Sequence, residues 1–227
     1  MSNIDIYMAS TWIIPALLAI TLHEAAHGYV AHLFGDDTAL NQGRVSFNPL
    51  KHIDPVGTIL LPALLVLSRA HFLFGYAKPV PVVFQNLKNP RRDMLWVAAA
   101  GPAMNILIAF TVAALFHGLK FLPQEAVGWV AQNLKNALVI NVFLAVFNML
   151  PILPLDGGRV LLSILPLPLA RVFARTERYG MLLIISFLFL LPMLAANVGL
   201  NPNTFSDFLT IPTEALIKSI WDVAGIR

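Results

Sequence analysis

Two histidines and a glutamate lie close together near the beginning of the sequence, in the stretch TLHEAAHG of residues 21–28. His23 and His27 are four residues apart, so on a helix their side chains lie one turn apart on the same face. Both imidazoles can then reach one metal ion, while Glu24, about 100° around the helix, lies beside a water bound to that ion. The pattern His-Glu-x-x-His is typical of zinc hydrolases, in which the glutamate is the general base. The alternative is a chance match in a helix with interfacial histidines.

The composition indicates a membrane protein. Hydrophobic residues make up 58% of the chain and charged residues 12%, and the mean hydropathy of +0.74 is far above that of a soluble domain. The sequence has no cysteine, which excludes disulfides and thiolate metal ligands, so a zinc site must use histidine and carboxylate. The formal net charge of +3 comes from basic residues in loops beside apolar stretches, which predicts contact with a lipid bilayer and no binding of nucleic acid.

The elements that must position the motif are predicted to be membrane helices. Residues 8–34 predict one long helix that carries the two histidines and Glu24 in its C-terminal half. No Lys or Arg precedes this apolar segment, so we expect it to be retained rather than cleaved as a signal peptide. Ionisable side chains at membrane depth are costly and are therefore functional candidates.

A second strong membrane helix is predicted over residues 94–119, and a third over residues 136–155, with residues 121–133 as a surface connection. The second contains Gly101-Pro102, where small residues permit close helix approach. Asn105, one turn further on, is expected either to line the active cavity, where it would bind substrate, or to hydrogen-bond a neighbouring helix.

Between the first and second helices the sequence predicts a re-entrant and partly extended insertion. Residues 56–74 are apolar but interrupted, which suits a re-entrant or tilted segment. Residues 44–49 alternate like a short strand, and the prolines of residues 78–84 favour extended backbone. These two pieces, with Val80 and Val82 in the second, are candidates for binding an unwound substrate segment by strand addition. Plain loop packing against the membrane is the alternative.

Asp156 is the candidate for a third metal ligand. It follows two closely spaced prolines, Pro151 and Pro154, and irregular backbone of this kind is tolerated in a membrane only inside protein or beside water. A catalytic zinc ion takes three protein ligands and leaves a fourth position for water. Asp-Gly-Gly is also ordinary turn chemistry, so the stretch alone leaves both readings open. The presence of the paired histidines favours the interpretation of Asp156 as a metal ligand.

Three motifs together resemble the site-2 proteases, polytopic zinc metalloproteases that cut within or beside transmembrane segments. The motifs are His-Glu-Ala-Ala-His at residues 23–27, Asn148-x-x-Pro-x-x-Pro-Leu-Asp156-Gly, and Gly101-Pro102-x-x-Asn105. The resemblance covers residues 8–160. It implies that His23, His27 and Asp156 bind one Zn²⁺, that Glu24 is the catalytic base, and that Asn148 hydrogen-bonds the substrate or its oxyanion. Many members also have an inserted PDZ domain or a nucleotide-binding regulatory domain, and residues 1–227 instead predict a single minimal membrane domain.

The ligand set predicts how the helices are oriented. His23 and His27 lie toward the C-terminal end of one helix, and Asp156 follows the C-terminal end of another. For the three side chains to meet, these two helices must run in the same direction, so one intervening segment does not cross the membrane. Residues 56–74, whose apolar run is interrupted, are a weaker candidate for a crossing than residues 94–119.

The basic residues then predict which side of the membrane holds the site. Residues 35–93 and 156–179 would share one side and carry most of the Lys and Arg, whereas the other side holds only Lys120 and Lys135 before the last span. By the positive-inside rule the site faces the cytosol, and the small single-module architecture suggests a prokaryotic plasma membrane.

The C-terminal part is predicted to hold one more span and a surface helix. Residues 160–173 suit the membrane interface, and residues 180–198 predict a span kinked at Pro192. Residues 204–227 place apolar side chains among polar ones at helical spacing, which favours an amphipathic helix on the membrane over one that binds a partner.

The function predicted from these residues is zinc-dependent cleavage of transmembrane protein substrates. A zinc transporter is one alternative, but it usually needs ionisable groups along a path through several helices, and Glu24 would then have no evident role. The other alternative is a non-catalytic membrane scaffold, which has no need of the base.

Overall fold

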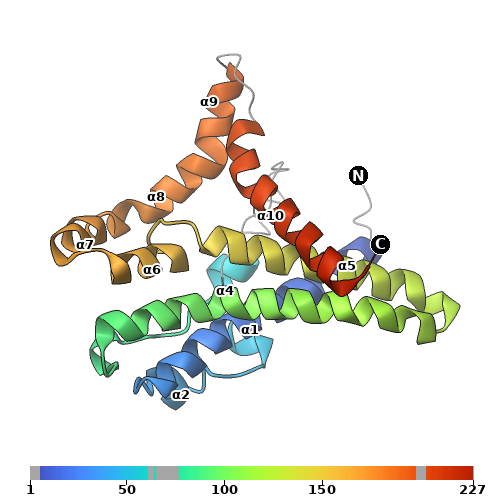
Figure 1. Ribbon diagram of the computed structural model, residues 1–227, viewed down its shortest axis with the longest axis horizontal. Coiled ribbons are helices and arrows are strands. Elements are labelled where there is room, and N and C mark those ends of the chain that lie inside the picture. The colour runs from blue at the N-terminus through green and yellow to red at the C-terminus, as the bar shows by residue number, and fades with distance from the viewer. Residues whose placement is uncertain (1–5, 61–63, 65–76, 198–202, 227) are drawn as a thin grey trace.

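A computed structural model of the chain describes residues 6–60, 64, 77–197 and 203–226. Three long helices dominate it: α1 (Ile6–Leu33), α4 (Pro90–Leu115) and α5 (Gln124–Asn148), which pack against one another (Figure 1). Within the described residues, three helices are long and apolar enough to cross a membrane: Ser10–Leu33, Pro90–Phe116 and Gln124–Asn148. The part of the chain that the structure describes contains helices and no strand. The prediction of an all-α polytopic membrane protein is therefore confirmed.

Hydrogen bonds between the long helices fix their directions. The pairs that show this are Thr11 with Asn136, Ala19 with Asn105, and His27 with Val97. Residue numbers on α4 fall as those on α1 rise, so α4 is antiparallel to α1. The short connection from α4 to α5 then makes α5 parallel to α1, the direction predicted from the need to bring Asp156 to the two histidines.

The polar segment after α1 differs from its prediction. A positive φ of 104° at Gly35 ends the helix, and α2 (Thr38–Asn41) follows. Residues 44–49 do not form the predicted strand. Asn48 instead caps a 3₁₀ turn, η1 (Pro49–Lys51), by accepting a hydrogen bond from the N–H of Leu50.

The predicted insertion before α4 is described only in part. A π turn, η2 (Pro55–Leu60), begins it, and residues 61–63 and 65–74 of the predicted re-entrant segment lie outside the described residues. Residues 77–83, called here the extended segment, form neither helix nor turn, and the backbone of Val83 is extended, with φ −103° and ψ 105°. A 3₁₀ turn, η3 (Phe84–Asn86), then leads to α4.

The third long helix begins earlier than the sequence predicted. After a 3₁₀ segment, η4 (Phe116–Phe121), α5 starts at Gln124, and it ends at Asn148 instead of residue 155. The proposed surface connection is thus mostly the first part of the helix. Its polar side chains are accommodated along the helix, since Gln132 donates a hydrogen bond of 2.8 Å to Asn136.

The remaining helices follow a turn at residues 149–155. They are α6 (Asp156–Ile164), α7 (Leu167–Ala174), η5 (Glu177–Tyr179), α8 (Gly180–Ile185), η6 (Ser186–Leu190), α9 (Leu191–Asn197) and α10 (Asn203–Ala224). The π turn η6 comes just before Pro192, which supplies no N–H to the carbonyl four residues earlier. Of the predicted span 180–198, residues 180–197 are helical but interrupted, and residue 198 lies outside the described residues. This segment is not among the three candidate spans in the described residues.

The C-terminal amphipathic helix is present, but it packs on the protein itself. Helices α9 and α10 form an inverted V above the layer of α4 and α5 in Figure 1. Ile220 of α10 is fully buried against small and branched side chains of α4 and α5, and Trp221 contacts Phe116 edge to face. Part of its apolar face is therefore used within the chain, where the sequence favoured the membrane surface.

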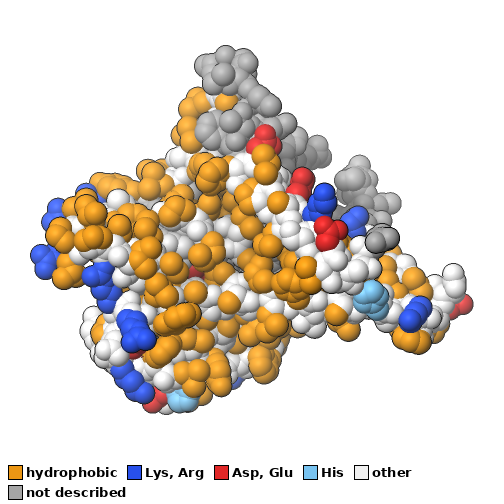
Figure 2. All heavy atoms as spheres, in the orientation of Figure 1, with side chains coloured by type: hydrophobic (Ala, Val, Ile, Leu, Met, Phe, Trp, Pro, Cys, Tyr) orange, Lys and Arg blue, Asp and Glu red, His pale blue; other side chains and the backbone are white. Residues whose placement is uncertain are grey.

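Figure 2 shows hydrophobic side chains spread over the middle of the visible face, with Lys and Arg gathered mainly toward its ends. Large apolar side chains of the three long helices are exposed, among them Leu18, Trp96, Leu107 and Phe143. A soluble protein would bury many of these, whereas in a bilayer they contact lipid chains.

Candidate metal centre

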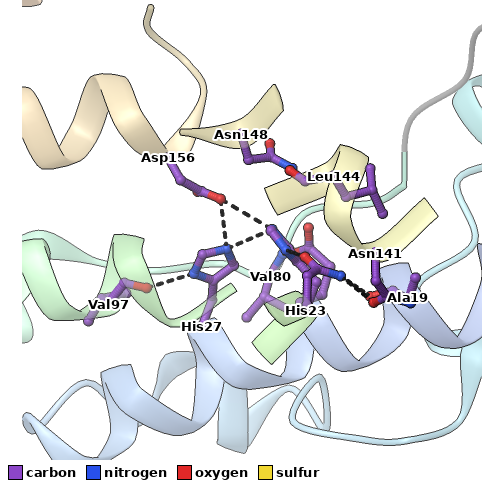
Figure 3. Close-up of polar contacts among 11 residues, drawn as sticks. Ala19, His23, His27, Val80, Val97, Asn141, Leu144, Asn148 and Asp156 are labelled. Carbon is purple, nitrogen blue, oxygen red and sulfur yellow. Dashed lines mark hydrogen bonds and ion pairs between the residues drawn. The ribbon is translucent and has the colours of Figure 1, made fainter. Parts of the chain in front are cut away.

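Three predicted ligand side chains meet in one place (Figure 3). His23 and His27 project from α1, and Asp156 reaches them from the first turn of α6. The Nε2 atoms of the two histidines are 3.1 Å apart. Oδ2 of Asp156 lies 3.2 Å from Nε2 of His23 and 3.4 Å from Nε2 of His27. The three donor atoms thus form a nearly equilateral triangle.

This triangle has the dimensions of a zinc site. Ligand bonds of about 2.0–2.1 Å in tetrahedral geometry place neighbouring donor atoms about 3.3 Å apart. Oδ2 of Asp156 is also buried with no hydrogen-bond partner among the described residues. A buried carboxylate oxygen without a partner is costly, and a cation at the centre of the triangle would satisfy it. The residues present therefore fit a metal ion.

Gly101 of α4 leaves the space in which the triangle lies. A Cβ atom built on Gly101 would be 2.6 Å from Cε1 and Nε2 of His23, and it would overlap Nε2 of His27 as well. Any other residue would therefore push the imidazoles away. The glycine of the Gly-Pro motif explains how α4 can pass so close to the histidines.

Two further glycines place Asp156. A Cβ on Gly157 would overlap the backbone of Met149 and Leu150, and one on Gly158 would lie 2.6 Å from backbone atoms of Ile152 and Leu153. The turn of residues 149–155 therefore folds tightly against the start of α6. This close packing fixes the carboxylate on the side that faces α1.

Each histidine is held through its other ring nitrogen. Nδ1 of His27 is 2.7 Å from the carbonyl oxygen of Val97, and Nδ1 of His23 is 2.5 Å from Oδ1 of Asn105. Both Nε2 atoms therefore face the triangle. Metal-ligating histidines almost always donate their second N–H in this way.

Asn105 forms hydrogen bonds to neighbouring helices, one of the two roles that the sequence left open. It is fully buried, and its amide contacts His23, Ala19 and Asn141. Its polar atoms are therefore used between the helices, and the side chain is buried.

Glu24 lies beside the extended segment that precedes α4. Its Oε2 accepts a hydrogen bond of 2.7 Å from the backbone N–H of Val80, which leaves Oε1 for another partner. The same segment is fixed at both ends: Arg44 donates to the carbonyl of Lys78 at 2.6 Å, and Val83 donates to Asp36 at 2.6 Å. The segment thus orients the carboxylate of Glu24.

Sequence reasoning did not single out Asp36. Its side chain is fully buried and accepts hydrogen bonds from Thr38, Val83 and Asn86. Burial alone would raise the pKa of Asp36, but these hydrogen bonds together outweigh it and hold the pKa below its usual range. One signal was available, since an acidic residue three positions beyond the end of a helix, as Asp36 is beyond Leu33, is electrostatically unfavourable and needs a compensating partner.

The other predicted residues lie nearby with different contacts. Nδ2 of Asn148 donates to the carbonyl of Leu144 in its own helix, at 3.0 Å, and no hydrogen bond connects it to the ligand triangle within the described residues. Val80 is buried and Val82 is partly exposed, both in the extended segment. The N–H of Val80 is used by Glu24, so strand addition at Val80 would rely on its carbonyl.

A bundle of apolar helices that encloses two imidazoles and a carboxylate at zinc-binding spacing defines a membrane metalloenzyme. Known proteins narrow this class. The profile that describes peptidase family M50 matches residues 120–192. The protein named "Putative zinc metalloprotease YwhC" of Bacillus subtilis is 38% identical over 186 residues, which is 80% of this chain and 80% of that protein.

Two other relatives carry similar names. "Putative zinc metalloprotease Rip2" of Mycolicibacterium smegmatis is 30% identical over 76% of this chain and 64% of its own length. "Putative zinc metalloprotease MJ0611" of Methanocaldococcus jannaschii is 43% identical over 29% of this chain and 31% of its own length. No solved structure matches the chain. The chain belongs to peptidase family M50, the site-2 protease family, and it is a membrane zinc metalloprotease.

Proposed function

We propose that this protease cleaves peptide bonds in or near the transmembrane segments of other membrane proteins. The observation that supports this most directly is the position of the ligand triangle. It lies between α1, α4 and the start of α6, and His23 and His27 are buried within a helix that is long and apolar enough to span a bilayer. A peptide bond that reaches this position comes from a segment at or near membrane depth.

In this proposal His23, His27 and Asp156 hold the zinc ion. When bound, zinc polarises the scissile carbonyl and lowers the pKa of a bound water toward 7. The two Nδ1–H hydrogen bonds, to Val97 and Asn105, keep the imidazoles turned toward the ion.

Glu24 is the proposed general base. Its Oε2 is fixed by the N–H of Val80, and Oε1 is left to accept the proton of the attacking water and to deliver it to the leaving amine. Because the carboxylate is already oriented, it loses little further freedom when substrate binds.

Asn148 and the extended segment are the proposed substrate contacts. An amide nitrogen carries two hydrogens, so Nδ2 of Asn148 can keep its bond to Leu144 and donate a second one to a developing oxyanion. Val80 and Val82 lie in a segment that is neither helix nor turn and that ends in the extended backbone of Val83, which suits pairing with an unwound substrate segment.

Co-expression with candidate single-span proteins tests the proposed function. The native chain should release a fragment that Glu24→Gln does not release, with zinc content unchanged, because glutamine keeps the size but cannot accept a proton. Glu125→Gln, which changes an exposed glutamate at the start of α5, is the matched control and should cleave normally. Zinc uptake into vesicles by Glu24→Gln, with no cleavage by the native chain, would instead establish a transporter.

We also propose that the site lies toward the cytosol in a prokaryotic plasma membrane. The chain has no cysteine, so single-cysteine variants give unambiguous labelling. Exposed Lys88 precedes α4, and exposed Lys120 lies near its other end. In intact cells an impermeant thiol reagent should label Lys120→Cys and not Lys88→Cys. The reverse pattern contradicts the orientation.

A further inference from the structure

We propose that Asn105, itself held by Asn141, is a positioning residue that determines which nitrogen of His23 faces the metal. The proposal rests on the metal-binding role given to His23 above. It concerns a chain of hydrogen bonds that begins on the backbone of α5 and ends at an imidazole of α1.

The orientation of the Asn105 amide follows from its neighbours. One neighbour is the carbonyl oxygen of Ala19, 3.3 Å away, which can only accept a hydrogen bond. Nδ2 of Asn105 must therefore face Ala19, and Oδ1 must face His23. Since an amide oxygen can only accept, Nδ1 of His23 must carry the proton. Nε2 is then left with its lone pair directed at the triangle.

Asn141 prevents the Asn105 amide from turning over. Oδ1 of Asn141 accepts a second hydrogen bond from Nδ2 of Asn105, at 2.9 Å. The direction of this contact is also imposed, because Nδ2 of Asn141 donates to the carbonyl of Ala137 at 2.8 Å. Two backbone carbonyls, those of Ala137 and Ala19, thus fix both amides.

Burial keeps the amides of Asn105 and Asn141 in these orientations. Asn105 is 0% exposed and Asn141 is 1% exposed, so neither amide can exchange a partner for water. An unsatisfied polar group inside a membrane bundle is costly, and turning either amide would face like atoms toward each other. The tautomer of His23 is therefore set by side chains of α4 and α5.

The two histidines differ in the kind of group that holds Nδ1. His27 is held by the backbone carbonyl of Val97, which no substitution at that position removes. His23 is held by a side chain. Substitutions at Asn105 should therefore disturb one ligand and leave the other in place.

The test is zinc affinity, measured by competition with a chelator on purified protein in detergent. Asn105→Leu should weaken binding about 10- to 100-fold, as is typical when a partner of a ligating histidine is removed. Asn141→Leu should weaken it by a smaller factor. Because Asn141 acts only through Asn105, the double variant should bind zinc no worse than Asn105→Leu alone.

Asn136→Leu is the matched control. Asn136 is also a buried asparagine of α5 that donates to an α1 carbonyl, at 2.9 Å from Thr11, but it has no contact with a histidine. Its replacement should leave zinc affinity within about twofold of native. The proposal is overturned if Asn105→Leu binds within threefold of native, or if the losses from Asn105→Leu and Asn141→Leu multiply.

A measurement on the native protein covers the case in which Asn105→Leu does not fold. In zinc-loaded protein with ¹⁵N-labelled histidine, His23 should bind zinc through Nε2 and keep its proton on Nδ1. Coordination through Nδ1 would overturn the proposal. Both experiments work without a substrate. Native protein that binds zinc tightly but cleaves nothing would therefore count against the proposed function alone.

Discussion

Replacing Gly101 with alanine is the sharpest test of the metal centre. The new methyl carbon would lie 2.6 Å from two ring atoms of His23. Carbon and nitrogen atoms in contact prefer a separation of about 3.5 Å, so the rings must move by about 1 Å. Metal bonds tolerate departures of only about 0.2 Å. We therefore expect Gly101→Ala to weaken zinc binding by more than about 100-fold, beyond the effect of losing a histidine partner.

The matched control is Gly128→Ala in α5. Both glycines lie within long helices, so both substitutions gain about 1 kcal/mol of helix propensity. The nearest atom to a Cβ on Gly128 is the hydroxyl oxygen of Tyr7, at 4.0 Å, which is an ordinary contact. Zinc affinity and the thermal unfolding midpoint should be measured for both variants in the same detergent. Gly128→Ala should bind zinc like the native protein.

The outcome that refutes this reasoning is a folded Gly101→Ala variant that binds zinc within threefold of native. The imidazoles would then have room that the structure does not give them, and the triangle would not be the metal site. A variant that loses zinc but keeps its unfolding midpoint in zinc-free buffer would support the reasoning most strongly, because the damage would then be confined to the site.

Three further predictions follow from other contacts. Asp156→Asn should weaken zinc binding by more than about 100-fold, because a neutral amide is a poor ligand, and chelator competition measures this. Because its hydrogen bonds lower the pKa of Asp36, their stabilisation is complete above the unfolded value of about 3.9 and is lost as pH falls through the lowered pKa. Hydrogen exchange at the Val83 amide, corrected for intrinsic rate, should therefore accelerate in acid, and Asp36→Asn should show fast exchange already at neutral pH. Ile220→Ala, at a fully buried site, should cost about 2–5 kcal/mol of stability and lower the thermal midpoint with zinc affinity unchanged.

The cluster of His23, His27 and Asp156 could be predicted from the sequence because each residue belongs to a local pattern. The spacing of His23 and His27 fixes their common face on any helix, and the prolines before Asp156 mark irregular backbone. The directions of the helices followed from the need to bring these side chains together. Their proposed roles as metal ligands come from the family resemblance.

The contacts that orient the site could not be predicted in the same way. The hydrogen bonds from the N–H of Val80 to Glu24 and from the N–H of Val83 to Asp36 each connect residues far apart in the sequence. Nothing in the local sequence distinguishes an asparagine that hydrogen-bonds a histidine from one that binds substrate, so the sequence leaves both roles possible for Asn105. The predicted start of α5 is wrong because polar side chains need not end a membrane helix. Gln132 and Asn136 instead pair with each other along α5.

The parallel run of α1 and α5 has a consequence for biosynthesis. The histidines are translated early, but their carboxylate partner follows only after α5. A chain released before residue 156 therefore has two of the three ligands and no complete centre for hydrolysis. In the proposed mechanism activity needs the carboxylate of Asp156, so we expect a chain that ends before α6 to be inactive toward its neighbours in the membrane.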